Sequence, residues 1–261
     1  PKAEFRPEWV LRFGAYPVTR ALQNIIAQVP LQLLVEPRPR WSDPNQQLTQ
    51  LLRADPIAAC QAIRAASPMP AHAGWHASFA QLETESKPQK AGDHITALID
   101  ALPENCPLFV GNSLAIRQLD THSGSAEKSL IFYGNRGASG IDGNISTALG
   151  IAAIHGRVVA LLGDLTSQHD LGGLALAQGR DAVIITVNNA GGGIFDLLPQ
   201  ASLPEFERGW RTPQTINFEH AALAFGLNYA RAENNETFKI ALHQAIHQGG
   251  PHLLELITPS A

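Results

Sequence analysis

Short apolar runs alternate with amphipathic segments along the chain after residue 93. The runs that suit buried strands are 108–111, 130–133, 158–162, 183–187, 227–230 and 253–257. Helical patterns separate them, near 113, over 143–154, near 171–178, and over 218–225 and 236–247. A further amphipathic helix, with Ile95, Leu98 and Leu102 on one face, precedes the first strand behind a cap at Asp93. Because neighbouring parallel strands need crossovers, this order predicts an α/β fold with a doubly wound parallel sheet.

The first part of the chain repeats this alternation on a smaller scale. We expect strands over 9–13, 31–35 and near 48–52, and helices over 17–28, from 56 and over 71–83. Pro17 and Pro56 suit a first helical turn, because that turn leaves its amides unpaired anyway. The polar run from Glu83 to Asp93 is typical of a linker. We therefore expect a smaller α/β part over 1–84, a linker over 85–93 and the main sheet over 94–261.

Composition and charge exclude several classes of partner. The 261 residues are 44% hydrophobic and 16% charged, with a formal net charge of −4 and a pI of about 6.2. The thin spread of basic residues argues against nucleic acid and anionic lipid, and no apolar run reaches the roughly 18 residues of a membrane helix. Cys60 and Cys106 lack metal-site spacing. We expect a soluble, cytoplasmic protein and, since strand-like sequence follows Pro1 without a preceding turn, a fragment of a longer chain.

Two of the predicted strands end in oxygen-bearing residues. Asp164 follows the strand over 158–162, and Asn188 and Asn189 follow the strand over 183–187. Ligands of a parallel sheet bind beyond the carboxyl ends of its strands, and one crossover makes these strands neighbours or near neighbours. A carboxylate, an amide oxygen and a carbonyl of the glycine-rich turn suit Mg²⁺, and a helix beginning near Asp170 would offer amides to an anion. The pattern therefore predicts a clamp for a metal ion and a diphosphate.

Two other interpretations stay open on residue types alone. Asp and Asn side chains bond to their own backbone in turns, so both stretches are also typical of ordinary Asx turns. A nicotinamide site is less favoured, because neither "GDLTSQ" nor "GNRGASGIDG" places the GxGxxG pattern after a strand. The choice depends on the other motifs of the chain.

Those motifs resemble the thiamine-diphosphate-dependent enzymes. Gly163-Asp164-Leu165 followed by Asn188-Asn189 looks like their GDG…NN motif, with Leu165 in place of the third glycine. Three stretches, "GNSLAIR" (111–117), "NRGASGIDG" (135–143) and "NNAGGGIF" (188–195), resemble one branch of that superfamily. This branch is the 2-succinyl-5-enolpyruvyl-6-hydroxy-3-cyclohexene-1-carboxylate synthases of menaquinone biosynthesis. The resemblance is strong over 109–199 and weak in the flanking residues.

The resemblance implies a fold, a cofactor and site residues. The fold would be the diphosphate-binding domain of those enzymes, preceded by the C-terminal portion of their central α/β domain. Thiamine diphosphate would bind with Mg²⁺ or Mn²⁺, held by Asp164, Asn189 and the carbonyl of Gly191. The cofactor would also contact Ile141, which would hold its bent conformation, together with Gly163, Asp164, Leu165, Ile194 and Phe195. Ser113, Arg117 and Arg136 would bind substrate carboxylates, which guanidinium groups recognise as planar forks.

The resemblance further implies a reaction, partners and a limit on this chain. The synthase would decarboxylate 2-oxoglutarate and add the succinyl-semialdehyde unit to isochorismate. Its activating glutamate would belong to a pyrimidine-binding domain of a partner subunit, so we expect no catalytic residue here, an inactive isolated chain, and a homodimer or tetramer of the full-length protein. The alternatives are another carboligase or decarboxylase of acetolactate-synthase type, and a non-catalytic diphosphate-binding module.

Overall fold

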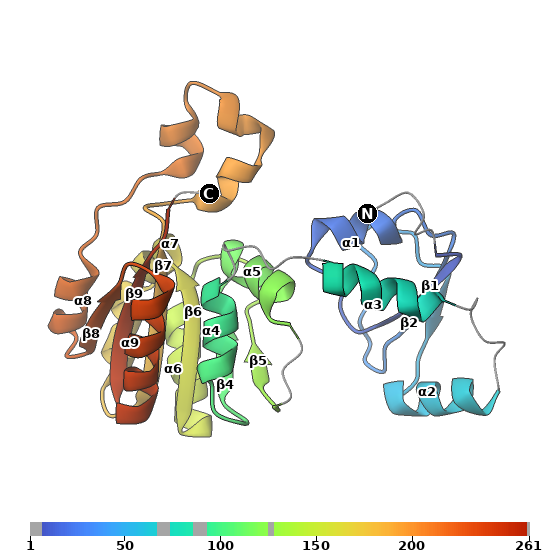
Figure 1. The fold of residues 1–261 in the computed structure, drawn as a ribbon, viewed down its shortest axis with the longest axis horizontal. Coiled ribbons are helices and arrows are strands. Elements are labelled where there is room, and N and C mark those ends of the chain that lie inside the picture. The colour runs from blue at the N-terminus through green and yellow to red at the C-terminus, as the bar shows by residue number, and fades with distance from the viewer. Residues whose placement is uncertain (1–6, 67–73, 86–92, 125–127, 260–261) are drawn as a thin grey trace. The chain divides into compact units, whose positions relative to one another are not determined.

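The computed structural model describes residues 7–66, 74–85, 93–124 and 128–259, and the chain forms two compact units, Pro1–Lys87 and Pro88–Ala261 (Figure 1). Of the predicted linker, Glu85 closes one helix and Asp93 opens the next, whereas 86–92 lie outside the described residues. Each unit is an α/β structure with parallel strands, as the sequence predicts.

The first unit contains a three-stranded parallel sheet in the order β1-β2-β3. Its strands are β1 (Trp9–Phe13), β2 (Leu31–Val35) and β3 (Gln50–Leu52), which confirms the three predicted strands. Its helices are α1 (Arg20–Ile26), α2 (Pro56–Ala65) and α3 (Trp75–Glu85). Helix α2 begins at Pro56 as predicted, because the Asp55 carboxylate accepts the amides of Ile57 and Ala58. The predicted helical residues 71–73 lie outside the described residues.

Helix α1 begins three residues later than the proline pattern predicts. The carbonyl of Pro17 accepts a 2.8 Å hydrogen bond from the side chain of Gln23, and Thr19 is extended, with φ −71° and ψ 122°. The segment after Pro17 is therefore held by a side chain instead of by the helix ladder, so the predicted start at Pro17 is wrong.

The second unit is built on six parallel strands in the order β5-β4-β6-β7-β9-β8. The strands are β4 (Pro107–Val110), β5 (Ile131–Tyr133), β6 (Arg157–Gly163), β7 (Asp181–Asn188), β8 (Asn228–Ala232) and β9 (Pro251–Ile257). All six predicted strands are present, and the doubly wound parallel sheet is confirmed. The strands that precede Asp164 and Asn189, β6 and β7, are direct neighbours.

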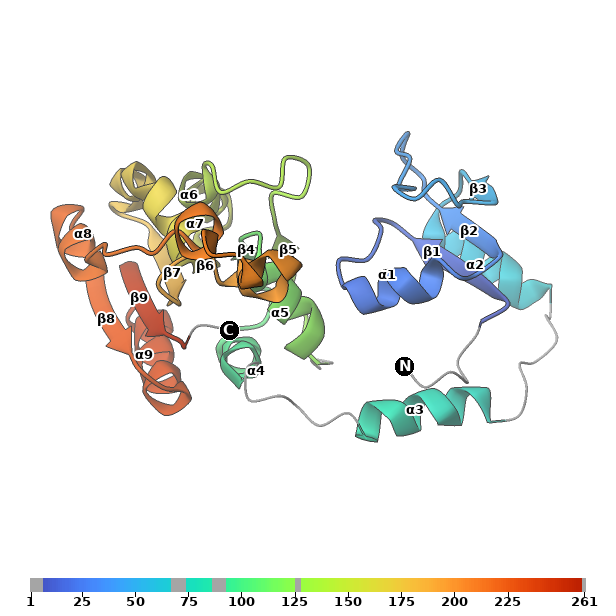
Figure 2. The same ribbon diagram turned by 90° about the horizontal axis from the view of Figure 1, so that it is seen from above.

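Helices cover both faces of this sheet (Figure 2). One face packs against α4 (Asp93–Ala101), α5 (Leu114–His122) and α9 (Asn235–Gln248). The other packs against α6 (Asn144–His155), the 3₁₀ helix η2 (Leu171–Ala177) and α8 (Phe218–Ala224). Asp93 is the first residue of α4, where its charge favours the helix N-terminus, instead of the residue before the helix. No helix among the described residues is both long and apolar enough to cross a bilayer.

The connections of the sheet reverse direction between β4 and β6. The chain passes from β4 to β5 on one side, and from β6 to β7 on the other. Their carboxyl ends therefore flank a switch point, where α/β sheets bind ligands. Helix α7 (Asp164–His169), which the sequence did not predict, begins at once after β6, and the helix expected near 171–178 is present as η2, with Asp170 at its N-cap. Between β7 and α8, the segment with η3 (Gly193–Leu197), η4 (Pro199–Ser202) and the π-helix η5 (Glu207–Arg211) rises above this edge (Figure 1).

Candidate functional site

Asp164 lies at the junction of β6 and α7 with its carboxylate buried. Its side chain is 2% exposed. Oδ1 accepts the Leu165 amide and Oδ2 accepts the Gly191 amide, both at 2.7 Å. Burial raises the pKa of this carboxyl, against the opposing effect of the Gly191, Leu165 and Asn189 amides and the Arg211 charge. The site therefore holds a desolvated carboxylate, which a bound cation would stabilise in its charged form.

The two asparagines after β7 have different surroundings. The side-chain amide of Asn188 donates to Glu255 Oε1 at 2.6 Å, and its Oδ1 accepts the Ala190 amide at 2.9 Å. Asn189 instead has a buried Oδ1 atom with no hydrogen-bond partner. A buried oxygen without a partner costs free energy unless a ligand binds it. Asn188 thus shapes the turn, while Asn189 offers an oxygen to a ligand.

The glycines after Asn189 allow a very close backbone approach. Gly191 has φ +135°, and a Cβ there would lie 2.4 Å from the carbonyl oxygen of Arg211. A Cβ on Gly193 would lie 2.3 Å from Asn189 Nδ2. The carbonyl of Gly191 accepts the Gly193 amide at 2.9 Å and keeps a second lone pair. The turn after β7 can take this shape only with glycine at these positions.

Arg211, from η5, completes this turn and has no signal in the sequence. It is 5% exposed, and its Nη2 donates to the carbonyl of Asn189 at 2.7 Å. Its Nε lies 3.6 Å from Asp196 Oδ1. The segment above the sheet edge therefore holds the Asn189 backbone in place, which spacing along the chain does not reveal.

The donor set fits a hard divalent cation. No group of three or more His, Cys, Asp or Glu side chains among the described residues could hold a metal. The oxygens available are the Asp164 carboxylate, the unpartnered Asn189 Oδ1 and the Gly191 carbonyl, all on the β6 and β7 ends. Such oxygen ligands suit Mg²⁺, which shares its shell with phosphates. A Cβ on Gly163 would meet nothing within 4 Å, so the backbone beside Asp164 faces open space.

The predicted carboxylate-binding residues follow β4 and β5. Ser113, with φ +66°, precedes α5, and its carbonyl accepts Arg117 Nη1 at 2.9 Å. Arg136 Nη1 donates to Asn112 Oδ1 at 2.6 Å, and Asn112 Nδ2 donates to the Gly140 carbonyl at 2.8 Å. Asn112, which the sequence did not single out, thus links the segment after β4 to the one after β5. Arg117 and Arg136 are both exposed, so their guanidinium groups are open to solvent and to a ligand.

The remaining predicted cofactor contacts lie around the same sheet edge. Gly163 ends β6, Leu165 is half-buried in the first turn of α7, and Ile141 is half-buried in the segment before α6. Ile194 and Phe195 are half-buried in η3, and a Cβ on Gly192 would lie 2.7 Å from the Phe195 ring. Asp170 directly precedes η2, as expected of a helix start, and its side chain accepts the Ser146 amide at 2.7 Å in the first turn of α6.

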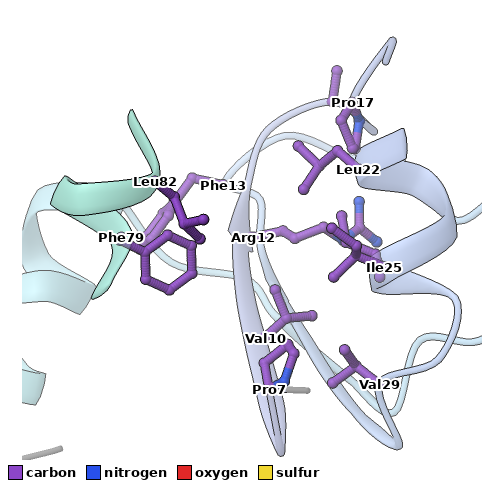
Figure 3. Close-up of a pocket in the computed structure, with 12 residues that line it drawn as sticks. Pro7, Val10, Arg12, Phe13, Pro17, Leu22, Ile25, Val29, Phe79 and Leu82 are labelled. Carbon is purple, nitrogen blue, oxygen red and sulfur yellow. The ribbon is translucent and has the colours of Figure 1, made fainter. Parts of the chain in front are cut away.

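A cavity of about 480 Å³ in the first unit has a different character (Figure 3). Apolar side chains of β1, α1 and α3 line it, among them Val10, Leu22, Ile25 and Phe79, with Arg12 among them. Nε and Nη1 of Arg12 are buried in it without a hydrogen-bond partner. Among the described residues of its lining, none has a carboxylate or carboxamide that could hold a hard cation. The candidate metal site is therefore at the β6 and β7 ends.

Comparison with known proteins finds a matching family and several relatives. Residues 118–256 match the family model described as "Thiamine pyrophosphate enzyme, C-terminal TPP binding domain". A 2-succinyl-5-enolpyruvyl-6-hydroxy-3-cyclohexene-1-carboxylate synthase of Dechloromonas aromatica (strain RCB) is 58% identical over 97% of this chain and 48% of its own length. Synthases of the same name from Roseiflexus castenholzii and Bacillus cytotoxicus are 37% and 33% identical, over 46% and 47% of their lengths. The chain spans about half the length of these curated relatives.

A solved structure shows the same fold. Benzoylformate decarboxylase from Polynucleobacter necessarius matches with a TM-score of 0.68 over 97% of this chain and 50% of that chain, at 15% sequence identity. At this identity the likeness concerns the fold alone. The α/β architecture predicted from the sequence is therefore also that of a solved decarboxylase.

Proposed function

This chain belongs to the thiamine pyrophosphate enzymes through their C-terminal TPP-binding domain, and on that premise we propose that it forms part of a thiamine-diphosphate- and Mg²⁺-dependent synthase. The reaction we propose is decarboxylation of 2-oxoglutarate and transfer of its succinyl-semialdehyde unit to isochorismate. The names of the relatives and the "NRGASGIDG" stretch support this choice over an acetolactate-synthase type. We further propose that the complete protein is a cytoplasmic homodimer or tetramer.

One structural observation carries the metal and cofactor part of this proposal. The buried Asp164 carboxylate accepts amides of the same turn that holds the unpartnered Asn189 Oδ1. Asp164, Asn189 and the Gly191 carbonyl would hold Mg²⁺, and Mn²⁺ suits the same oxygen set. When bound, thiamine diphosphate would supply the nucleophilic carbon and the electron sink needed to decarboxylate a 2-oxo acid.

The other residues of the site bind and orient. Ile141, Leu165, Ile194 and Phe195 would pack against the cofactor, and Gly163 leaves room beside its diphosphate. Ser113, Arg117 and Arg136 would bind the carboxylates of the substrates. Both arginines are exposed, and each donates one hydrogen bond to a nearby oxygen, of Ser113 or Asn112. A substrate carboxylate would accept from their other N–H groups or take the place of these oxygens.

Binding and turnover are tested separately. Calorimetric titration of the chain with thiamine diphosphate and Mg²⁺ tests the clamp, with Asp164→Ala as the negative variant. Turnover is tested after joining the chain to the part of the Dechloromonas aromatica relative that it does not span, a protein we call the assembled enzyme. Isochorismate with 2-oxoglutarate should be converted and pyruvate should not. Preference for pyruvate would favour the acetolactate-synthase type, and cofactor binding without any turnover would favour a non-catalytic module.

We propose that the 261 residues alone are inactive. The clamp residues lie within Gly163–Gly193, whereas the activating glutamate implied by the resemblance belongs to another domain. The purified chain, with both substrates, Mg²⁺ and saturating thiamine diphosphate, should show no synthase activity. Turnover close to that of the assembled enzyme would contradict this and would place an activating group within the chain.

A further inference from the structure

A buried carboxylate that the proposed reaction does not use lies behind the metal-binding turn. Glu255, in β9, is 5% exposed. Its Oε1 accepts the Asn188 side-chain amide at 2.6 Å, and its Oε2 accepts the Tyr229 hydroxyl at 2.5 Å. Burial and the Glu255 contact both raise the pKa of Tyr229, which keeps its hydroxyl protonated as a donor. Each carboxylate oxygen thus has one donor, from a different strand.

These contacts link β8 and β9 to the turn after β7, which carries the proposed metal ligands. Asn188 is held on both sides, since its carbonyl accepts the Thr258 amide at 2.9 Å while its side chain donates to Glu255. Asn188 Oδ1 then accepts the Ala190 amide, across a turn in which Ala190 has φ +60° and Gly191 φ +135°. Such positive φ angles at a non-glycine residue persist only where neighbouring contacts hold them. The Asn189 and Gly191 oxygens depend on that turn.

We propose that Glu255 is a positioning residue: its carboxylate fixes the Asn188 side chain and so orients the Asn189 and Gly191 oxygens toward the metal ion. This inference rests on the proposed metal site. The competing interpretation is that Glu255 only joins β8 to β9, because Arg231 of β8 is its neighbour in the strand register. Both interpretations predict some loss of stability when Glu255 is removed, but only positioning predicts a selective loss of metal affinity.

A neighbouring cavity makes the proposal testable by chemical rescue. About 430 Å³ of space borders Asn188, Asn189, Tyr229 and Glu255. Truncating Glu255 would open its carboxylate position to this cavity, where a small carboxylate such as formate can accept from Asn188 and Tyr229. Glu219 lines the same cavity but is exposed, so Glu219→Ala is a matched control that removes a nearby carboxylate and leaves the Asn188–Glu255–Tyr229 hydrogen bonds intact.

The experiment measures Mn²⁺ affinity by electron paramagnetic resonance in the assembled enzyme at saturating thiamine diphosphate, with melting temperature measured separately without metal or cofactor. Because partners that orient metal ligands typically contribute 10 to 100-fold in affinity, Glu255→Ala should weaken Mn²⁺ binding by roughly 10-fold or more. Glu255→Gln keeps an acceptor for Asn188 and should stay within about 3-fold of wild type. Formate should restore binding to Glu255→Ala, and Glu219→Ala should bind as wild type.

The outcomes separate this inference from the proposed function. If the assembled wild-type enzyme binds no Mn²⁺ with cofactor, the proposed metal site fails, and the positioning role fails with it. If wild type binds, Asp164→Asn does not, and Glu255→Ala binds as wild type, only the positioning role is overturned. The positioning role is also overturned if Glu255→Ala loses Mn²⁺ affinity, formate does not restore it, and Glu255→Gln shows the same loss. Should Glu255→Ala not fold, Asn188→Ala decides, since it breaks the same link and should weaken Mn²⁺ binding by a similar factor.

Discussion

The Oδ2 atom of Asp164 accepts a 2.7 Å hydrogen bond from the backbone amide of Gly191, which joins the start of α7 to the turn after β7. This bond places the Asp164 carboxylate beside the turn that carries Asn189 Oδ1 and the Gly191 carbonyl, the other oxygens of the proposed metal site. Pre-organised ligands lower the ordering cost of binding. The burial of Asp164 and the unpartnered Asn189 oxygen both favour binding of a cation at this turn.

Replacing Asp164 should weaken metal binding and reduce the pH dependence of stability. Because burial raises the pKa of Asp164, its ionised form is disfavoured by folding, and the contribution of this group to stability falls as pH rises through its folded pKa. The melting temperature of Asp164→Asn, measured without metal or cofactor, should therefore vary less with pH than that of wild type. Both Asp164→Asn and Asp164→Ala should bind Mg²⁺ with thiamine diphosphate at least about 10-fold more weakly. Unchanged affinity by calorimetry would contradict the ligand assignment.

Gly193→Ala should disturb the metal site without unfolding the sheet. Its Cβ would lie 2.3 Å from Asn189 Nδ2, so the Asn189 side chain must move. Such overpacking costs about 1–3 kcal/mol, and we expect cofactor affinity to fall by 10-fold or more. The matched control is Gly150→Ala in α6, where a Cβ meets nothing within 4 Å. That variant should gain about 0.5–1 kcal/mol in unfolding free energy and bind cofactor normally.

Arg136→Ala should impair use of dicarboxylate substrates. Loss of a charge-assisted hydrogen bond costs about 1.5–3 kcal/mol, so kcat/KM of the assembled enzyme should fall roughly 10 to 100-fold while cofactor affinity stays constant. Arg136→Lys should recover part of this, because it keeps the charge but loses the planar fork. Arg64→Ala, at an exposed position of α2, serves as the control. Wild-type kinetics for Arg136→Ala would remove it from the substrate site.

His94 should make the second unit less stable in mild acid. Burial lowers the pKa of this histidine in α4, although a hydrogen bond with Gln118 opposes the shift. Because the unfolded chain then binds the proton more readily, this contribution to stability is present above the unfolded pKa of 6.5 and lost as pH falls from there toward the folded pKa. The unfolding free energy of His94→Gln, from urea titrations at several pH values, should vary less between pH 7 and 5 than that of wild type. A slope equal to that of wild type and of the exposed-site control His243→Gln would contradict this.

Much of the fold follows from local patterns. The six strands of the second unit were predictable because each is a short apolar run between helical segments, and parallel strands buried on both faces need only apolar side chains. The segment 193–211 was not predictable, since its 3₁₀ and π turns depend on contacts such as that of Gly192 with the Arg211 carbonyl, 2.7 Å apart. The start of α1 also depended on a side-chain contact, from Gln23 to Pro17.

By itself, the sequence determined the α/β class, the strand ends at which Asp164 and Asn189 stand, and the motifs that place the chain among thiamine-diphosphate enzymes. These features depend on residue type and spacing, which a linear chain carries in full. Only the tertiary structure decided that the Asn188 side chain donates to Glu255 while Asn189 has a buried oxygen without a partner. It also decided that Arg211 donates to the Asn189 carbonyl. Those choices depend on burial and on hydrogen bonds between residues such as Asn188 and Glu255, which lie 67 positions apart and meet only when β7 and β9 pair.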